Sequence, residues 1–284
     1  FTMRVGRFAP TPTGPLHMGS LVTALASFLD IKKNKGIWSI RIDDLDHPRN
    51  DPEAAENILE CLKQHGLVTQ VKIDLQSKNL DNYQSAMEAL NPLLFRCNCS
   101  RKSVAKYEVY PGTCRKKNLS AEDAAVRLKM PNKKMTFKDK IQGLIVTHLS
   151  TEVGDLILRR RDKIFSYNLA TACDDGADRI TDVLRGADLL PFTNQQIFLM
   201  KLLKLEPPEY SHIPVVCYPD GTKLSKQSGA TKLENKFAVD NLLIAMKFLG
   251  LEPPKYLASV PNLLEWAIDH WSIENLPKNF QPYQ

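Results

Sequence analysis

The sequence predicts an α/β protein built on a doubly wound parallel sheet of the Rossmann type. Three observations support this prediction: strand and helix patterns alternate from the N-terminus, a turn rich in Pro, Gly and Thr follows the first strand, and the alternation resumes after an interruption in the middle of the chain. Such alternation is typical of βαβ units, whose strands are parallel and whose helices cover the sheet.

The first quarter of the chain supplies the opening elements in order. Residues 4–8 are short and apolar-flanked, which favours a buried first strand. Residues 19–31 repeat apolar side chains with helical spacing, and Gly36 marks the end of that helix. Residues 38–42 predict a second strand, and a helix with an acidic start follows from Asp51.

The middle of the chain departs from this pattern and predicts an insertion. Strand–helix alternation is absent after Leu94 and resumes near residues 155–158, 167–172 and 180–184, with a helix near 195–203. Two more amphipathic helices are expected near the C-terminus, at residues 242–249 and 263–268. We therefore expect a catalytic domain formed by residues 1–94 and 156–226, an inserted subdomain at 95–155, and a helical region at 227–284.

Charge is distributed unevenly. The chain has a net charge of +6, but lysine and arginine are concentrated between Arg96 and Lys163, and the rest of the chain is net negative. A basic surface of this kind favours a polyanionic partner, although a solvated lysine-rich surface gives the same pattern. No apolar run reaches the roughly 20 residues of a membrane span, and no signal peptide is recognisable. We expect a cytoplasmic protein without a membrane partner.

The six cysteines fall into two groups. Cys97, Cys99 and Cys114 are close in sequence, which in a cytosolic chain favours a metal site over a disulfide. Reduced cysteines without a ligand remain the alternative. The others lie in apolar segments and are expected in the core: Cys61, Cys173 and Cys217.

Two segments carry the expected chemistry. Residues 12–20 follow the first strand, and there His17 can donate to a phosphate oxygen while Gly19 lets the backbone approach a flat base. Lys223 and Lys226 flank a serine on a loop, where two point charges can hold a leaving pyrophosphate. Taken singly, the two segments are also typical of an ordinary turn and a solvated basic loop.

Together, these segments resemble the two signature sequences of the class I aminoacyl-tRNA synthetases. The glutamyl branch of that class is indicated by residues 6–14, 41–46, 167–170 and 184–188, and the resemblance covers about the first 230 residues. Three details are similar to the glutamyl-Q tRNA(Asp) synthetase family: Gly19-Ser20-Leu21, Asp46-His47-Pro48-Arg49, and Gln227 at the end of the second signature. Only 58 residues follow Lys226, which we expect to be too few for an anticodon-binding domain.

The resemblance implies a role for each matching residue. The guanidinium group of an arginine binds a carboxylate in a bidentate manner and leaves a neutral amide poorly paired, which suits a glutamate site. The implied catalytic residues are His17, Gly19, Lys223 and Lys226, and ATP, which carries Mg²⁺, is bound by His17, Gly19 and Lys226. The implied glutamate-binding residues are Arg7, Thr11, Asp43, Tyr167 and Arg185. The implied structural zinc site, one per chain, consists of Cys97, Cys99, Tyr110 and Cys114.

Asp43 departs from the family pattern. The family usually has glutamate at this position, where it is expected to meet the substrate ammonium group. Aspartate keeps the charge and loses one methylene of reach, so either the backbone shifts, or water bridges the gap, or the ammonium is bound more weakly.

The sequence therefore predicts ATP-dependent activation of glutamate and its transfer to queuosine in the anticodon of tRNA(Asp), with no obligate protein partner. Three alternatives remain: a short glutamyl-tRNA synthetase that charges a tRNA 3′ end, a small-molecule adenylyl- or nucleotidyltransferase, and a non-catalytic RNA-binding relative. Intact His17, Gly19, Lys223 and Lys226 argue against the last of these.

Overall fold

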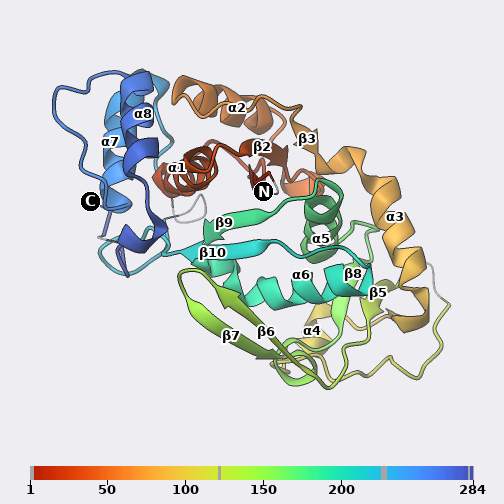
Figure 1. Ribbon diagram of the computed structural model, residues 1–284. Helices are drawn as coiled ribbons and strands as arrows, with labels where there is room; N and C mark the ends of the chain where they lie inside the picture. Colours follow the sequence, from red (N-terminus) through yellow and green to blue (C-terminus); the bar gives the residue numbers. More distant parts are fainter. Residues whose placement is uncertain (1–2, 121–122, 225–228, 281, 284) are drawn as a thin grey trace.

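The central sheet is parallel throughout, as the sequence predicts. The structure, a computed structural model, describes residues 3–120, 123–224, 229–280 and 282–283 (Figure 1). The strand order is β10-β9-β1-β2-β3, and every neighbouring pair is parallel. The strands are β1 (Val5–Phe8), β2 (Ile37–Ile42), β3 (Asp74–Leu75), β9 (Asp182–Gly186) and β10 (Glu209–Ile213).

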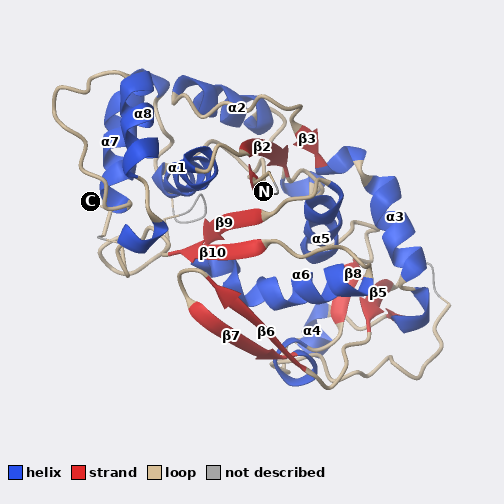
Figure 2. Cartoon of the chain, viewed as in Figure 1, coloured by secondary structure: helices blue, strands red, loops and turns tan. Residues whose placement is uncertain are grey.

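Helices cover both faces of this sheet (Figure 2), which confirms the doubly wound class. On β9, Leu184 packs into the apolar cluster formed with α1, whereas its neighbour Val183 packs into the cluster formed with α5 and α6. Successive strand residues point to opposite faces, so the two clusters are the two sides of the sheet. The first cluster contains residues of α1 (Met18–Lys33), α2 (Ala54–Gln64), α7 (Ala238–Phe248) and α8 (Val260–His270). The second contains residues of α3 (Leu80–Ala89), α5 (Tyr167–Ala177) and α6 (Leu190–Leu202).

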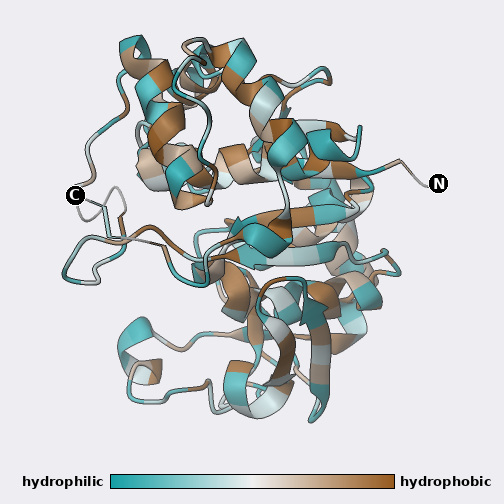
Figure 3. Ribbon diagram, turned by 60° about the vertical axis from the view of Figure 1, so that its left-hand side comes forward, coloured by the Kyte–Doolittle hydropathy of each residue, from teal (hydrophilic) through white to brown (hydrophobic). Residues whose placement is uncertain are grey.

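The two C-terminal helices owe their orientation to one-sided apolar patterns. In Figure 3 apolar and polar bands alternate along α7 and α8, and the apolar positions Leu242, Met246 and Leu263 are fully buried. Gly250, with φ of +73°, ends the segment after α7 in the left-handed conformation that favours glycine. None of the helices in the described part of the chain combines the length and apolar character that a bilayer crossing requires.

The insertion has its own strands. An antiparallel sheet with the order β4-β5-β8 is formed by β4 (Leu94–Cys97), β5 (Ala125–Leu128) and β8 (Leu156–Arg159). A separate antiparallel hairpin, β6 (Lys134–Asp139) and β7 (Gly143–His148), lies beside β10, and a short α4 (Arg101–Val104) follows β4 (Figure 1).

Strand pairing shows which sheet the strands predicted after the interruption belong to. The strand expected near residues 155–158 is β8, and it pairs with β5 of the insertion rather than with the central sheet. The segments at 167–172, 180–184 and 195–203 correspond to α5, β9 and α6, with bounds that differ by a few residues. The pattern did not predict β10, because its sequence Glu-Tyr-Ser-His-Ile carries polar residues that are buried in the fold. The division of the chain into three parts stays a prediction.

Candidate active site

A cavity of about 480 Å³ opens at the carboxyl ends of β1 and β9. These strands are neighbours in the sheet although a long stretch of chain separates them, so the cavity lies where the strand order reverses. Open α/β sheets bind ligands at this point. The cavity gathers seven of the residues predicted for the site: Arg7, Thr11, His17, Gly19, Tyr167, Arg185 and Lys223.

The first signature segment is placed by the start of α1. His17 is the N-cap of the helix, and its ring accepts a hydrogen bond from the backbone N–H of Ser20 at 3.4 Å. A side chain at Gly19 would meet the His17 ring at 3.2 Å and the carbonyl oxygen of Leu224 at 3.4 Å. Glycine at this position therefore leaves room for the His17 ring, next to the backbone of the second signature.

The second signature reaches the same cavity through Lys223. Its Nζ forms a salt bridge with Asp188, which follows β9, and both residues line the cavity. The Lys223 side chain is half-exposed, so its ammonium group can move from Asp188 to an anionic ligand. Lys226 lies outside the described residues, and its role stays a prediction.

Arg7 is held by a buried carboxylate. Its Nε and Nη2 donate to the two oxygens of Asp175 at 3.1 and 2.9 Å, and Arg41 donates to the same carboxylate at 2.6 Å. Burial by itself raises the pKa of Asp175, but the charges of Arg7 and Arg41 outweigh it and hold the pKa below its ordinary value. Asp175 therefore compensates much of the charge of Arg7.

Asp43 is not among the residues that line the cavity. Its side chain is buried, and one carboxylate oxygen accepts from Nε of Arg41 at 2.9 Å. Its backbone N–H donates to the carbonyl of Pro10 in the turn after β1, which keeps it close to the site. Contact between Asp43 and a substrate ammonium group stays a prediction, and it requires this carboxylate to be shared with Arg41.

Arg185 differs from Arg7 because its partners are neutral. Its Nε lies 3.0 Å from Nε2 of His212, Nη1 donates to the Tyr167 hydroxyl at 3.3 Å, and Nη2 donates to Thr193 at 2.9 Å. Among the described residues, no carboxylate forms a salt bridge with Arg185, although its side chain is almost entirely buried. A buried guanidinium without a counterion strongly favours an anionic ligand.

The cysteine cluster forms a candidate metal site in the insertion. The Sγ atoms of Cys97, Cys99 and Cys114 lie within 4.8 Å of one another, and Cys99 and Cys114 are 3.6 Å apart. Two thiolates on one tetrahedral zinc are separated by about 3.8 Å, since each Zn–S bond is about 2.3 Å. The donor set and its spacing therefore fit zinc.

Tyr110 lies against this cluster. Its hydroxyl is 3.4 Å from Sγ of Cys97 and accepts from the backbone N–H of Cys114 at 2.9 Å. Burial raises the pKa of Cys97, but its hydrogen bonds with Tyr110, the backbone of Cys99 and Arg127 outweigh it and lower the pKa to about 7. Ligation by Tyr110 stays a prediction.

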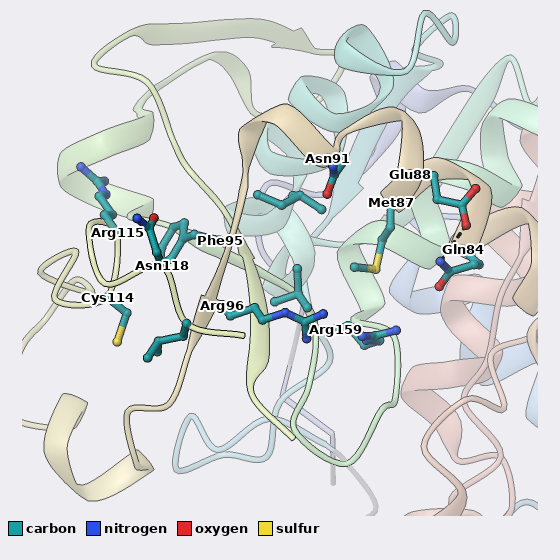
Figure 4. Close-up of a pocket in the computed structure, with 13 residues that line it drawn as sticks. Gln84, Met87, Glu88, Asn91, Phe95, Arg96, Cys114, Arg115, Asn118 and Arg159 are labelled. Carbon is teal, nitrogen blue, oxygen red and sulfur yellow. Dashed lines mark hydrogen bonds between the residues drawn. The ribbon is translucent and has the colours of Figure 1, made fainter. Parts of the chain in front are cut away.

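A second cavity, of about 670 Å³, lies between α3 and the insertion and is lined by Cys114 as well as by three arginines (Figure 4). Arg96 on β4 and Arg159 on β8 are both register partners of Val126, so they share one face of the small sheet. Figure 4 shows their side chains extending into the same part of the cavity. Within the described residues, the buried Nε of Arg159 has no hydrogen-bond partner.

Sequence reasoning missed the residues that hold the two arginines. Asp175, Thr193, His212 and Asp139 are polar but buried, and no apolar pattern marks such positions in a sequence. For Asp175 a signal was present, because two aspartates follow an apolar helical segment at residues 169–173, and a buried carboxylate requires a cationic partner.

Comparison with known proteins places the chain in a family. A sequence profile described as tRNA synthetases class I (E and Q), catalytic domain, matches residues 3–243. A glutamyl-Q tRNA(Asp) synthetase from Pseudomonas aeruginosa is 42% identical over 279 residues, 96% of this chain and 95% of that protein. One from Ectopseudomonas mendocina is 42% identical over 283 residues, 98% of this chain and 96% of that protein.

The crystal structure of a glutamate tRNA ligase from Elizabethkingia meningosepticum has the same fold, with a TM-score of 0.82 at 24% identity over 99% of this chain and 67% of that chain. The fold and the cavity, together with the profile, define a class I tRNA synthetase catalytic domain of the glutamate and glutamine type. Within that class, the chain belongs to the glutamyl-Q tRNA(Asp) synthetase family. It is therefore a ligase-type enzyme.

Proposed function

We propose that the protein activates glutamate with ATP to form glutamyl-adenylate and transfers the glutamyl group to the queuosine base in the anticodon of tRNA(Asp). The observation that carries this proposal is the cavity at the switch point of the sheet. There Arg185 is buried beside both signature segments, and none of the described residues provides it with a counterion. The names of relatives that are 42% identical over almost their whole length support the identity of the acceptor.

In the first step, the α-carboxylate of glutamate attacks the α-phosphorus of ATP, an O–P bond forms, and pyrophosphate leaves. His17 and Lys223 stabilise the charge that develops on the phosphate oxygens, and we assign Lys226 to the same task. Mg²⁺ bound to ATP supplies further neutralisation of phosphate charge. The side-chain carboxylate of glutamate lies against Arg185, with Arg7, Tyr167 and Thr11 around it, and Asp43 is assigned to the ammonium group.

In the second step, a hydroxyl of the queuosine cyclopentene diol attacks the acyl carbon of glutamyl-adenylate, an ester forms, and AMP leaves. A single-stranded anticodon base can be splayed into a pocket, as is common in RNA recognition. The insertion, which carries most of the basic excess, is suited to hold the RNA backbone, and the cavity containing Arg96 and Arg159 supports such a role.

We assign the metal site a structural role. Zinc bound by Cys97, Cys99 and Cys114, with Tyr110 as the expected fourth ligand, would tie a loop-rich part of the insertion together. The cluster lies outside the glutamate cavity, and no step of the reaction uses it.

The test compares tRNA(Asp) with and without queuosine, and tRNA(Glu), as acceptors of labelled glutamate. Periodate destroys free cis-diols, so glutamylation of queuosine protects that base from oxidation. We expect glutamate-dependent ATP–pyrophosphate exchange without RNA, a strong preference for glutamate over glutamine, and transfer only to queuosine-containing tRNA(Asp). Charging of tRNA(Glu), or equal charging of tRNA(Asp) without queuosine, would instead identify a short glutamyl-tRNA synthetase. Absence of exchange with any amino acid contradicts the enzymatic proposal.

A further inference from the structure

Arg185 is held from one side by a buried histidine to which the reaction assigns no task. His212 on β10 is the register partner of Arg185 on β9. Its side chain is fully buried, and its Nε2 lies 3.0 Å from Nε of Arg185 and 3.1 Å from Oγ1 of Thr193. Thr193 in turn accepts from Nη2 of Arg185. His212 and Thr193 therefore occupy the Nε/Nη2 edge of the guanidinium.

The protonation of His212 is fixed by its other nitrogen. Nδ1 lies 2.6 Å from Oδ2 of Asp139, whose side chain is also fully buried. A carboxylate only accepts, so Nδ1 carries the proton, and in a neutral ring Nε2 is then an acceptor for the Nε–H of Arg185. Burial lowers the pKa of His212, and the charge of Arg185 lowers it further against the opposing effect of Asp139. A neutral ring is the form that matches these contacts.

Asp139 is itself held rigidly at the end of the inserted hairpin. It accepts from the backbone N–H groups of Ile141 and Gln142 at 2.9 and 2.8 Å. The backbone N–H of His212 also donates to Asp139 at 3.2 Å, and the Gln142 side chain donates to the carbonyl of His212 at 2.8 Å. Both the backbone N–H and the carbonyl of His212 therefore form hydrogen bonds with the hairpin.

We propose that His212, oriented by Asp139, is a positioning residue for recognition of the side-chain carboxylate of the substrate. It fixes the rotation of the Arg185 guanidinium, so that the Nη1/Nη2 edge serves the ligand. This inference rests on the proposed function, which assigns Arg185 to that carboxylate.

The neutrality of His212 is essential to this role. A carboxylate at this place would compensate the charge of Arg185, as Asp175 does for Arg7, and a cation would repel it. A neutral acceptor orients the guanidinium and leaves its charge for the ligand. The two arginines therefore have different roles: the charge of Arg7 is neutralised within the protein, and Arg185 keeps its attraction for an anion.

Two substitutions of similar size separate the two contacts of His212. In His212→Gln, the side-chain oxygen can take the place of Nε2 and accept from Arg185. In His212→Asn, the side-chain nitrogen can take the place of Nδ1 and donate to Asp139. We expect His212→Asn to raise the KM for glutamate about tenfold in ATP–pyrophosphate exchange, with little change in kcat or in the KM for ATP, and to weaken the preference for glutamate over glutamine. His212→Gln should stay within about threefold of the wild type, as expected when the hydrogen bond to Arg185 is kept.

Glutamate affinity without ATP, measured by titration calorimetry on the same folded proteins, should follow the same order. This second measurement does not require turnover. A wild-type protein without exchange activity would contradict the proposed function, and the glutamate affinities of the variants would still test the role of His212. The reverse order would mean that His212 serves only to satisfy Asp139, and the inference would be overturned. Equal glutamate affinities in the two variants would also overturn it, because affinity would then not depend on the acceptor that faces Arg185.

Discussion

At the scale of single residues, the two arginines of the cavity differ in what compensates their charge. Arg7 forms a two-point salt bridge with Asp175, which is fully buried and also bound by Arg41. Arg185 has only neutral partners among the described residues. Removal of the first leaves a buried carboxylate partly unpaired, whereas removal of the second leaves neutral groups that can rearrange. Stability and glutamate affinity should therefore respond to different arginines.

We expect Arg7→Gln to lower the free energy of unfolding by about 3–5 kcal/mol, the range for breaking a buried ion pair. The matched variant Arg185→Gln should cost less stability but should raise the KM for glutamate at least about a hundredfold, because a charge-assisted bidentate contact is lost. Chemical denaturation and ATP–pyrophosphate exchange measure the two effects. Equal destabilisation by both substitutions would contradict the division of roles.

A pH dependence follows from His212, whose folded-state pKa lies below its ordinary value. A depressed histidine pKa favours the neutral form in the folded protein, so its contribution to stability is present above the unfolded-state pKa of about 6.5 and is lost as the pH falls below it. Between pH 7.5 and 5.5 the wild type should therefore lose stability through this group.

His212→Gln should lack that component, and denaturant titrations of both proteins at the two pH values measure the difference. Asp174, whose pKa burial raises to about 6, titrates in the same range and with the opposite effect on stability. It is common to both proteins and cancels in the comparison. A wild type and a variant with parallel pH dependence would show that His212 does not titrate in this way.

At the scale of elements, the insertion combines a candidate metal site with a basic cavity, and both lie outside the glutamate cavity. The cluster joins the end of β4 to the loop around Cys114, a stretch with little regular structure. Purified protein should contain about one zinc per chain, as expected for one tetrahedral site. Cys99→Ser should abolish it and make the insertion sensitive to limited proteolysis.

ATP–pyrophosphate exchange by Cys99→Ser should persist, since the strands that form the glutamate cavity belong to the central parallel sheet and not to the insertion. Elemental analysis, proteolysis and the exchange assay test the three statements. A metal-free wild type with a protease-resistant insertion would contradict the structural role of zinc. If Tyr110→Phe keeps the metal, the fourth ligand is not this tyrosine.

The basic cavity makes a separate prediction for RNA. Arg159→Ala should weaken binding of queuosine-containing tRNA(Asp) by about tenfold, the scale of one charge-assisted hydrogen bond, without changing ATP–pyrophosphate exchange. Arg161→Ala is the matched control, because Arg161 follows the same strand but is exposed and does not line the cavity. Filter binding compares them. An equal effect of the two substitutions would indicate only a loss of general positive charge.

The sequence predicted these elements unevenly, and the reasons are physical. The largely apolar helix α1, the helix α8 with one apolar face and the apolar strand β2 were all visible in the sequence pattern. The strand β10 escaped because His212 and Ser211 are buried through hydrogen bonds and backbone pairing, which no apolar pattern records. The site motifs were visible because their residues are consecutive, whereas the pairing of Arg7 with Asp175 or of His212 with Asp139 depends on topology that joins distant segments.

At the scale of the whole molecule, the basic excess and the glutamate cavity belong to different parts of the chain. The basic excess lies between Arg96 and Lys163, mostly in the insertion, while the glutamate cavity is formed by the parallel sheet. The first reaction step uses small ligands held by buried groups, and the second uses a polyanion held by a basic surface. Salt screens and competes at exposed surfaces much more than at buried contacts.

The two half-reactions should therefore differ in salt dependence. Raising the salt concentration from 50 to 200 mM, the range over which a few phosphate contacts cost orders of magnitude in affinity, should leave exchange nearly constant and raise the KM for tRNA(Asp) steeply. Steady-state kinetics of exchange and of transfer, in the same buffers, give the two slopes. Arg159→Ala should reduce the slope of log KM for RNA against log salt by about one, because one phosphate contact is lost, and leave the slope for exchange unchanged. If exchange were as salt-sensitive as transfer, surface charge would also govern glutamate or ATP binding, and the separation between cavity and insertion would be wrong.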